Sequence, residues 1–206
     1  MKKITFILFL GMAVACNNAD KPAAKEDHSK HNMASQNLDG YADSVNAGLI
    51  TEDTLKGSPH RVVMKNIAGS HVHVEYGSPG VKGRIIWGGL VPYDQVWVTG
   101  AHSATQISFS KDLLWGGSPV PAGTYAFYTI PGKEEWTVIL NKKYEQHLAD
   151  EYSEKEDLIR IKVKPTTLTE QVPRLTYSLE ADGPDSGELI VAWEKIAIHI
   201  PINKKG

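Results

Sequence analysis

Two histidines and a carboxylate alternate along one short stretch of the chain, in the order His71, His73 and Glu75. Side chains two residues apart point to the same face of a β-strand, so these three are expected to share a face. The Cα atoms of the two histidines would lie about 6.6 Å apart, and two imidazoles at that spacing can converge on one metal ion. The residues between and after them are expected to face the core: Val72, Val74 and Tyr76.

A third metal ligand is expected from His102, which follows a β-rich stretch in a Gly-Ala turn. Loops on a rigid scaffold often supply such ligands. The sequence therefore predicts a site formed by His71, His73 and His102, with Glu75 or His147 as an additional ligand. Three imidazoles suit zinc or copper. The alternative is that these histidines are ordinary surface residues of a strand and a loop.

Two further groups of residues have metal-ligating side chains. His147 and Glu151 are four residues apart and would share a face of a short helix, which we predict within residues 142–156; the alternative is a solvated turn. Near the N-terminus, His28, His31 and Met33 could bind copper, although they also fit an ordinary polar linker.

The segments that must position these residues alternate between apolar and polar side chains with a period of two. Gly- and Pro-rich turns separate them at intervals of about 8–12 residues. This pattern predicts a single antiparallel β-sandwich of jelly-roll or immunoglobulin-like architecture with one short helix. The clearest predicted strands lie at residues 71–76, 125–130, 136–140, 158–164, 175–179 and 196–200.

The N-terminus carries the features of a signal peptide over residues 1–15: two lysines, an apolar run and a small-residue cleavage site. Cys16 follows at once, and this arrangement resembles a bacterial lipobox, which implies cleavage before Cys16 and lipidation of its thiol. An ordinary signal peptide is the alternative. We therefore expect a lipid-anchored protein of the bacterial cell envelope, in the outer membrane and facing the periplasm or the cell surface.

Residues 16–57 are polar and lack periodicity, which predicts a flexible tether with order beginning near Leu49 or Leu55. Residues 58–203 form the predicted sandwich domain. Lipidation of Cys16 would consume the only thiol, so disulfides and thiolate chemistry are excluded. The net charge of −2 argues against a nucleic-acid partner, and no later segment is apolar enough to span a membrane.

Four sequence blocks at residues 81–93, 96–101, 121–125 and 129–139 resemble the DUF2911 family, and the resemblance covers residues 58–201. The family contains exported proteins common in Bacteroidota, many of them lipoproteins, and its function is unknown. The resemblance therefore implies no catalytic residues. This chain reads Gly-Ala-His-Ser-Ala-Thr at residues 100–105 where many members read Gly-Ala-Asn-Glu-Ala-Thr. It resembles a histidine-bearing subgroup.

We therefore predict a membrane-anchored binding or interaction module rather than an enzyme, with zinc or copper as the metal. One alternative is a metal-dependent hydrolase that uses the same histidines with Glu75 as base. Another is a carbohydrate-binding module, which would need exposed, coplanar Trp rings. Arg84 is expected either to anchor an ion pair or to belong to an anion site.

Overall fold

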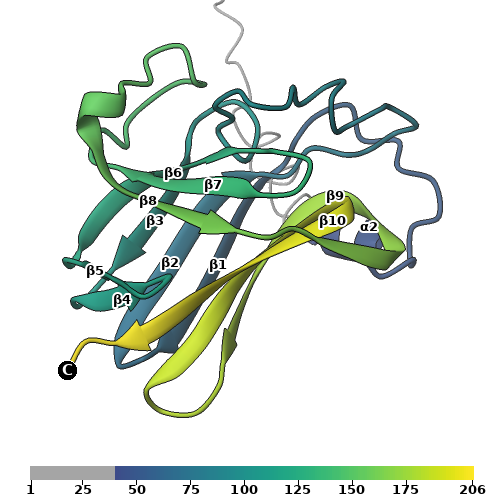
Figure 1. Cartoon of the computed structure of the whole chain (residues 1–206). Coiled ribbons are helices and arrows are strands. Elements are labelled where there is room, and N and C mark those ends of the chain that lie inside the picture. Colours follow the sequence, from purple (N-terminus) through teal and green to yellow (C-terminus); the bar gives the residue numbers. More distant parts are fainter. Residues whose placement is uncertain (1–39) are drawn as a thin grey trace, which may run out of the picture.

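The computed structural model describes residues 40–206, which form two antiparallel β-sheets packed face to face (Figure 1). The chain is therefore a β-sandwich, as the alternating sequence pattern predicts. The signal peptide at residues 1–15 lies outside the described residues. So do Cys16, His28, His31 and Met33, and the predictions made for them stay predictions.

The larger sheet has six strands, and every neighbouring pair in it is antiparallel. Its order is β1-β2-β3-β6-β7-β8, so β1 and β8 are its edges. The strands are β1 (His60–Ile67), β2 (Ser70–Gly77), β3 (Thr105–Phe109), β6 (Gly123–Ile130), β7 (Trp136–Asn141) and β8 (Asp157–Val163).

The smaller sheet has four strands in the order β5-β4-β10-β9. Two of them are short, β4 (Leu113–Trp115) and β5 (Ser118–Val120). The other two, β9 (Thr166–Ala181) and β10 (Ser186–Lys204), pair in one long hairpin that reaches across the larger sheet (Figure 1). The register of this hairpin shifts on both sides of Glu194, whose φ of 56° lies in the left-handed region.

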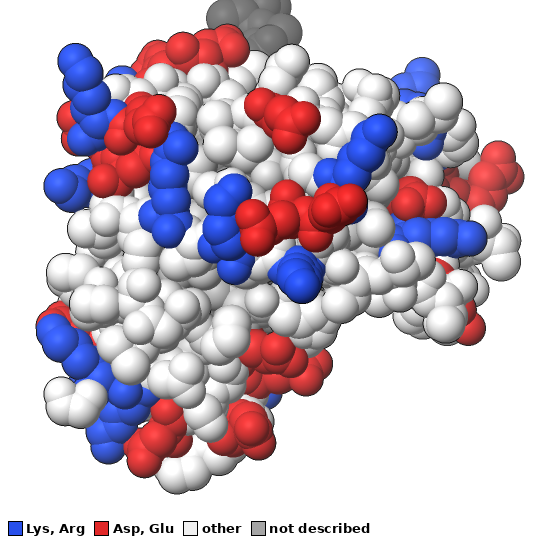
Figure 2. All heavy atoms as spheres, viewed as in Figure 1, with Lys and Arg blue, Asp and Glu red and all other residues white. Residues whose placement is uncertain are grey.

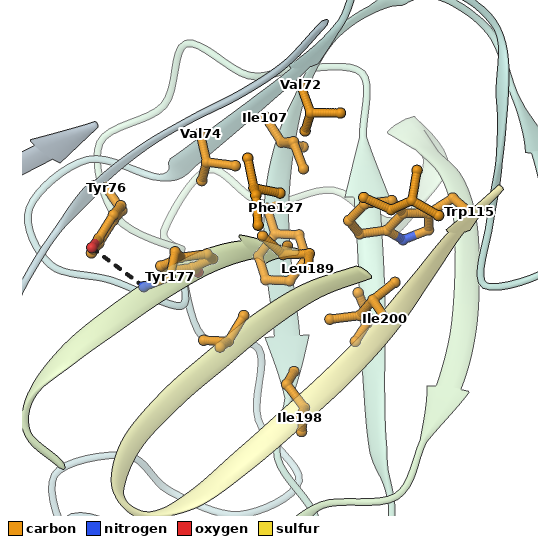
Figure 3. Close-up of a cluster of buried hydrophobic side chains, with 14 of the residues drawn as sticks. Val72, Val74, Tyr76, Ile107, Trp115, Phe127, Tyr177, Leu189, Ile198 and Ile200 are labelled. Atoms are coloured by element: carbon orange, nitrogen blue, oxygen red, sulfur yellow. Dashed lines mark hydrogen bonds between the residues drawn. The ribbon is translucent and has the colours of Figure 1, made fainter. Parts of the chain in front are cut away.

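The main hydrophobic core lies between the two sheets. Val72 and Val74 of β2 and Ile107 of β3 are fully buried on the inner face of the six-stranded sheet. Leu189 and Ile200 of β10 meet them from the other sheet (Figure 3). Each such aliphatic side chain contributes about 1.5–3 kcal/mol when it is removed from water. The predicted inward orientation of Val72, Val74 and Tyr76 is confirmed.

A second, smaller core lies on the opposite face of the six-stranded sheet. On β6, Phe127 belongs to the main core, whereas Tyr128 belongs to this second cluster, because consecutive residues of a strand face opposite sides. The loop at residues 142–153 covers it with Tyr144, Ala149 and Tyr152. β6 and β7 are thus covered on both faces, which explains their nearly continuous apolar sequences.

The predicted helix within residues 142–156 is wrong. The segment contains turns and one 3-10 turn, Glu154–Glu156. Its backbone instead pairs with the preceding loop: Ala104 N–H donates to Gln146 O at 2.9 Å, and Leu148 N–H donates to His102 O at 3.0 Å. Leu148 has a φ of 61°, which a right-handed helix cannot accommodate. Contacts to the second core therefore override the local helical tendency.

The α-helix of the described chain, α2 (Tyr41–Asn46), lies earlier than expected, within the predicted tether. Ala42 and Val45 of this helix are buried, and α2 lies beside β9 (Figure 1). Asn46 Nδ2 donates to Arg174 O at 3.0 Å, and Arg174 N–H donates to Asn46 Oδ1 at 2.8 Å. Ordered structure thus begins before Leu49, and residues 41–57 pack against the sandwich.

Candidate functional site

The outward faces of β1, β2 and β3 carry polar side chains beside the exposed Val62 and Met64, and Tyr144 of the loop at residues 142–153 borders this surface. His73 pairs with Met64 on β1 and with Ser108 on β3, and Glu75 pairs with Val62 and with Gln106 in the same way. His71, His73 and Glu75 alternate with buried residues, so their predicted common face is confirmed.

Glu75 lies between two imidazoles that come from different strands. His73 Nε2 is 3.2 Å from Glu75 Oε1, and His60 Nε2 is 3.5 Å from Glu75 Oε2. His73 Nε2 is buried, yet its contact with Glu75 does not have hydrogen-bond geometry. The antiparallel register of β1 and β2, which pairs His60 with Gly77, brings His60 to this carboxylate.

His71 shares the face of His73 but has its own partner. Its Nδ1 is 3.1 Å from Asn66 Oδ1, the residue opposite it on β1. The two imidazole rings are 6.4 Å apart between centroids and nearly perpendicular, at 85°. The structure therefore places His71 next to His73 but directs its ring nitrogen toward Asn66.

His102 lies in the loop that closes one end of this surface. It is exposed, and its φ of 70° lies in the left-handed region. With His60, Glu75 and Gln106 it lines a cleft of about 190 Å³. The loop approaches β2 closely, because a Cβ atom on Gly77 would lie only 2.4 Å from Ala101 O. Glycine at position 77 is thus needed to keep the His102 loop against β2.

A second cleft, of about 170 Å³, adjoins the first and shares Glu75 and Gln106 with it. Its other lining residues are His73, Ser108, Thr124 and Tyr144. We call the two clefts together the Glu75 groove. Each is smaller than the 300–1,000 Å³ typical of sites for drug-sized molecules, so an ion or a very small ligand suits the groove.

His147 does not line the Glu75 groove. Its backbone forms an isolated β-bridge with Ser103, and its side chain is exposed. Glu151, its expected helical neighbour, pairs with Lys143 Nζ at 3.0 Å instead. The prediction that His147 and Glu151 share a face of a helix is wrong, because the segment is not a helix.

Within residues 40–206, no three His, Cys, Asp or Glu side chains are arranged as a ready-made metal site. Of the predicted ligands, the structure brings His73, Glu75 and His102 to one groove, and it places His71 beside them. His60 was not among the ligands predicted from the sequence, yet it lines the groove. The sequence signal for it is the spacing of His60, Val62, Met64 and Asn66, which lie two residues apart and so share one face of β1.

The tryptophans do not form an exposed platform. Trp115, Trp136 and Trp193 are buried. Trp87 and Trp97 pack against Trp193, with ring centroids 5.9 and 5.7 Å away. These rings therefore belong to the hydrophobic core and its margin rather than to a sugar-binding surface.

The family model described as a protein of unknown function, DUF2911, matches residues 58–202. The chain therefore belongs to the DUF2911 family, as the sequence blocks predicted. No curated protein and no solved structure matches it. No helix within residues 40–206 is long and apolar enough to cross a membrane.

Proposed function

We propose that this protein is a binding module whose Glu75 groove takes a transition-metal ion, zinc or copper, through His60, His73 and Glu75. The observation that carries the proposal is the position of two imidazole nitrogens, 3.2 and 3.5 Å from the two oxygens of one carboxylate. His102 stands at the same groove as a further ligand.

Each of the two nitrogen–oxygen separations suits a pair of neighbouring metal ligands, and closing all three side chains on one ion requires them to rotate. With bonds of about 2.0–2.1 Å, the ligand atoms of a tetrahedral zinc site lie about 3.3 Å apart. The side chains of His60, Glu75 and His73 are 66%, 44% and 31% exposed, so they can rotate when an ion enters. The unpaired, buried His73 Nε2 gains a partner on binding, which favours the bound state.

Binding is favoured over hydrolysis because the groove offers a single carboxylate within residues 40–206. Glu75 is the only carboxylate among the described residues that line it. If Glu75 holds the metal, no second carboxylate stands there to activate a water molecule. A carbohydrate-binding role is less supported, because the Trp rings pack into the core.

We further propose that Cys16 is lipidated and holds the domain at the bacterial envelope, with residues 17–39 between the anchor and α2. The support is the sequence pattern of residues 1–16. The metal site would then face a compartment outside the cytoplasm. Mass spectrometry of the purified chain tests the anchor, because the Cys16→Ser variant should lose the lipid mass.

The metal proposal is tested by elemental analysis of the full chain after loading with zinc or copper and desalting. We expect His73→Ala and Glu75→Gln to lose about one equivalent that the parent chain retains. His199→Ala is the matched control, because His199 Nδ1 also pairs with a glutamate, Glu188, at 3.1 Å on the surface. Equal metal content in the parent chain and the His73 and Glu75 variants would contradict the proposal.

A further inference from the structure

A separate cleft of about 290 Å³ lies where the segment before the family domain meets the sandwich. Lys56, Lys82 and Arg84 line it, together with Ser58 and two glycines, Gly57 and Gly80. Of these residues, only Ser58 also lines the Glu75 groove. No carboxylate is among the described residues that line this basic cleft.

Asp53 lies against Gly80 at the wall of the cleft and pairs with a buried arginine. Its Oδ1 accepts a hydrogen bond from Arg174 Nη2 at 2.7 Å and lies 3.9 Å from Lys82 Nζ. Asp53 and the buried Arg174 therefore neutralise each other. The charges of Lys56, Lys82 and Arg84 are left in excess at the cleft, where they produce a positive potential.

The cations also keep free donors. Arg84 donates through Nε to Val81 O at 3.2 Å and through Nη2 to Gly80 O, which holds the guanidinium in place and leaves Nη1 available. Lys82 donates one of its three hydrogens to Leu55 O. Lys56 is exposed at the cleft, and Ser58 lines the cleft with its hydroxyl-bearing side chain.

We propose that this basic cleft binds the phosphate group of an anionic ligand. A fixed guanidinium, two ammonium groups and a hydroxyl supply the charge-assisted hydrogen bonds that a tetrahedral oxyanion accepts. The phosphate can belong to a phospholipid headgroup or to a soluble phosphate compound. Ile85, which follows Arg84, is 78% exposed, and Leu90 N–H donates to Ile85 O at 3.0 Å. An apolar tip beside cations suits a lipid surface.

The test is amide NMR spectroscopy of the full chain in zwitterionic micelles, with two additions made separately. Inorganic phosphate tests the soluble source, and phosphatidylglycerol mixed into the micelles tests the headgroup source. We expect one or both to shift the amide signals of Ser58, Gly80 and Lys82. A shift with phosphate alone identifies a soluble ligand, and a shift with phosphatidylglycerol identifies a headgroup.

Lys56→Gln and Arg84→Gln should each lower the affinity obtained from the titration by about fivefold, since each removes one cation from the site. Lys164→Gln is the control, because Lys164 is exposed and does not line the cleft. Lys82 is left unchanged because it also holds Leu55. Ile85→Ser should weaken only a phosphatidylglycerol response. The proposal is overturned if neither addition shifts these amides, or if the Lys56 and Arg84 variants respond as the parent does.

Discussion

Arg174 Nη2 donates to Asp53 Oδ1 at 2.7 Å, and the Arg174 side chain has no exposed surface. The same guanidinium donates through Nη1 to Gly57 O at 3.1 Å and to Ser78 O at 2.8 Å. One side chain of β9 thus holds both the segment before the family domain and the end of β2. The position of residues 41–57 depends on this buried ion pair.

Arg174→Met should therefore destabilise the fold strongly. Removing one partner of a buried ion pair leaves the other charge uncompensated, which costs about 3–5 kcal/mol. Lys162→Met is the control: its pair with Glu135 at 3.3 Å is exposed, so its loss should cost less than about 1 kcal/mol. Urea denaturation gives both free energies of unfolding. Equal losses in the free energy of unfolding would show that Arg174 does not hold residues 41–57 in place.

The two faces of the six-stranded sheet should respond differently to truncation. Ile107 is fully buried in the main core, so Ile107→Ala should lower the free energy of unfolding by about 2–5 kcal/mol. Met64 on the open outer face is 56% exposed, so Met64→Ala should change it by less than about 0.5 kcal/mol. Thermal or urea denaturation of the two variants checks this. A large effect at Met64 would mean that the outer face is covered.

Stability should fall at alkaline pH because of two tyrosines near the second core. Burial, aided by nearby acidic groups, raises the pKa of Tyr128 and of Tyr152 from 10.0 to about 12. The unfolded chain therefore releases these protons first, and the stability contributed by the neutral phenols is present below pH 10 and lost as the pH rises toward 12. Denaturation at pH 8 to 11.5 measures the decline.

Tyr128→Phe separates this effect from other alkaline titrations. The substitution removes the hydrogen bond from Tyr128 Oη to Gln146 Oε1, which is 2.7 Å long, so the variant should be less stable at pH 8. It should also lose less stability than the parent chain between pH 10 and 11.5. Parallel pH profiles for the two proteins would contradict the assignment.

Gly77→Ala should disturb the site rather than the core. A Cβ at this position would lie 2.4 Å from Ala101 O, so the loop carrying His102 must move away from β2. We expect lower stability and weaker zinc binding, measured by denaturation and by calorimetric titration. Gly57→Ala is the control, because a Cβ there meets nothing within 4 Å. Unchanged zinc binding in Gly77→Ala would show that the loop does not contribute.

The sequence predicted those features that depend on local alternation. The period of two placed His71, His73 and Glu75 opposite Val72 and Val74, which the structure confirms. Alternation within β2 cannot show which residue of another strand lies beside Glu75. That depends on how β1 pairs with β2. The chain turns between these strands at Ala68 and Gly69, and the resulting register brings His60 to Glu75.

The other features that the sequence did not predict depend on contacts between residues far apart in the chain. Arg174 and Asp53 are 121 residues apart, and no local pattern in residues 41–57 indicates that a buried arginine holds them. The segment at residues 142–156 contains residue types that favour a helix. Packing Tyr144 and Tyr152 on the second core stabilises the chain more than one isolated short helix would.

The central claim is that His60 and His73 bind a metal together with Glu75. The most direct measurement is the imidazole ¹⁵N spectrum of the full chain before and after one equivalent of zinc. We expect the Nε2 signals of His60 and His73 to shift to the values of metal-bound nitrogen, while those of His199 stay unchanged. If His60 and His73 do not shift, or if only His28 and His31 respond, the Glu75 groove is not the metal site.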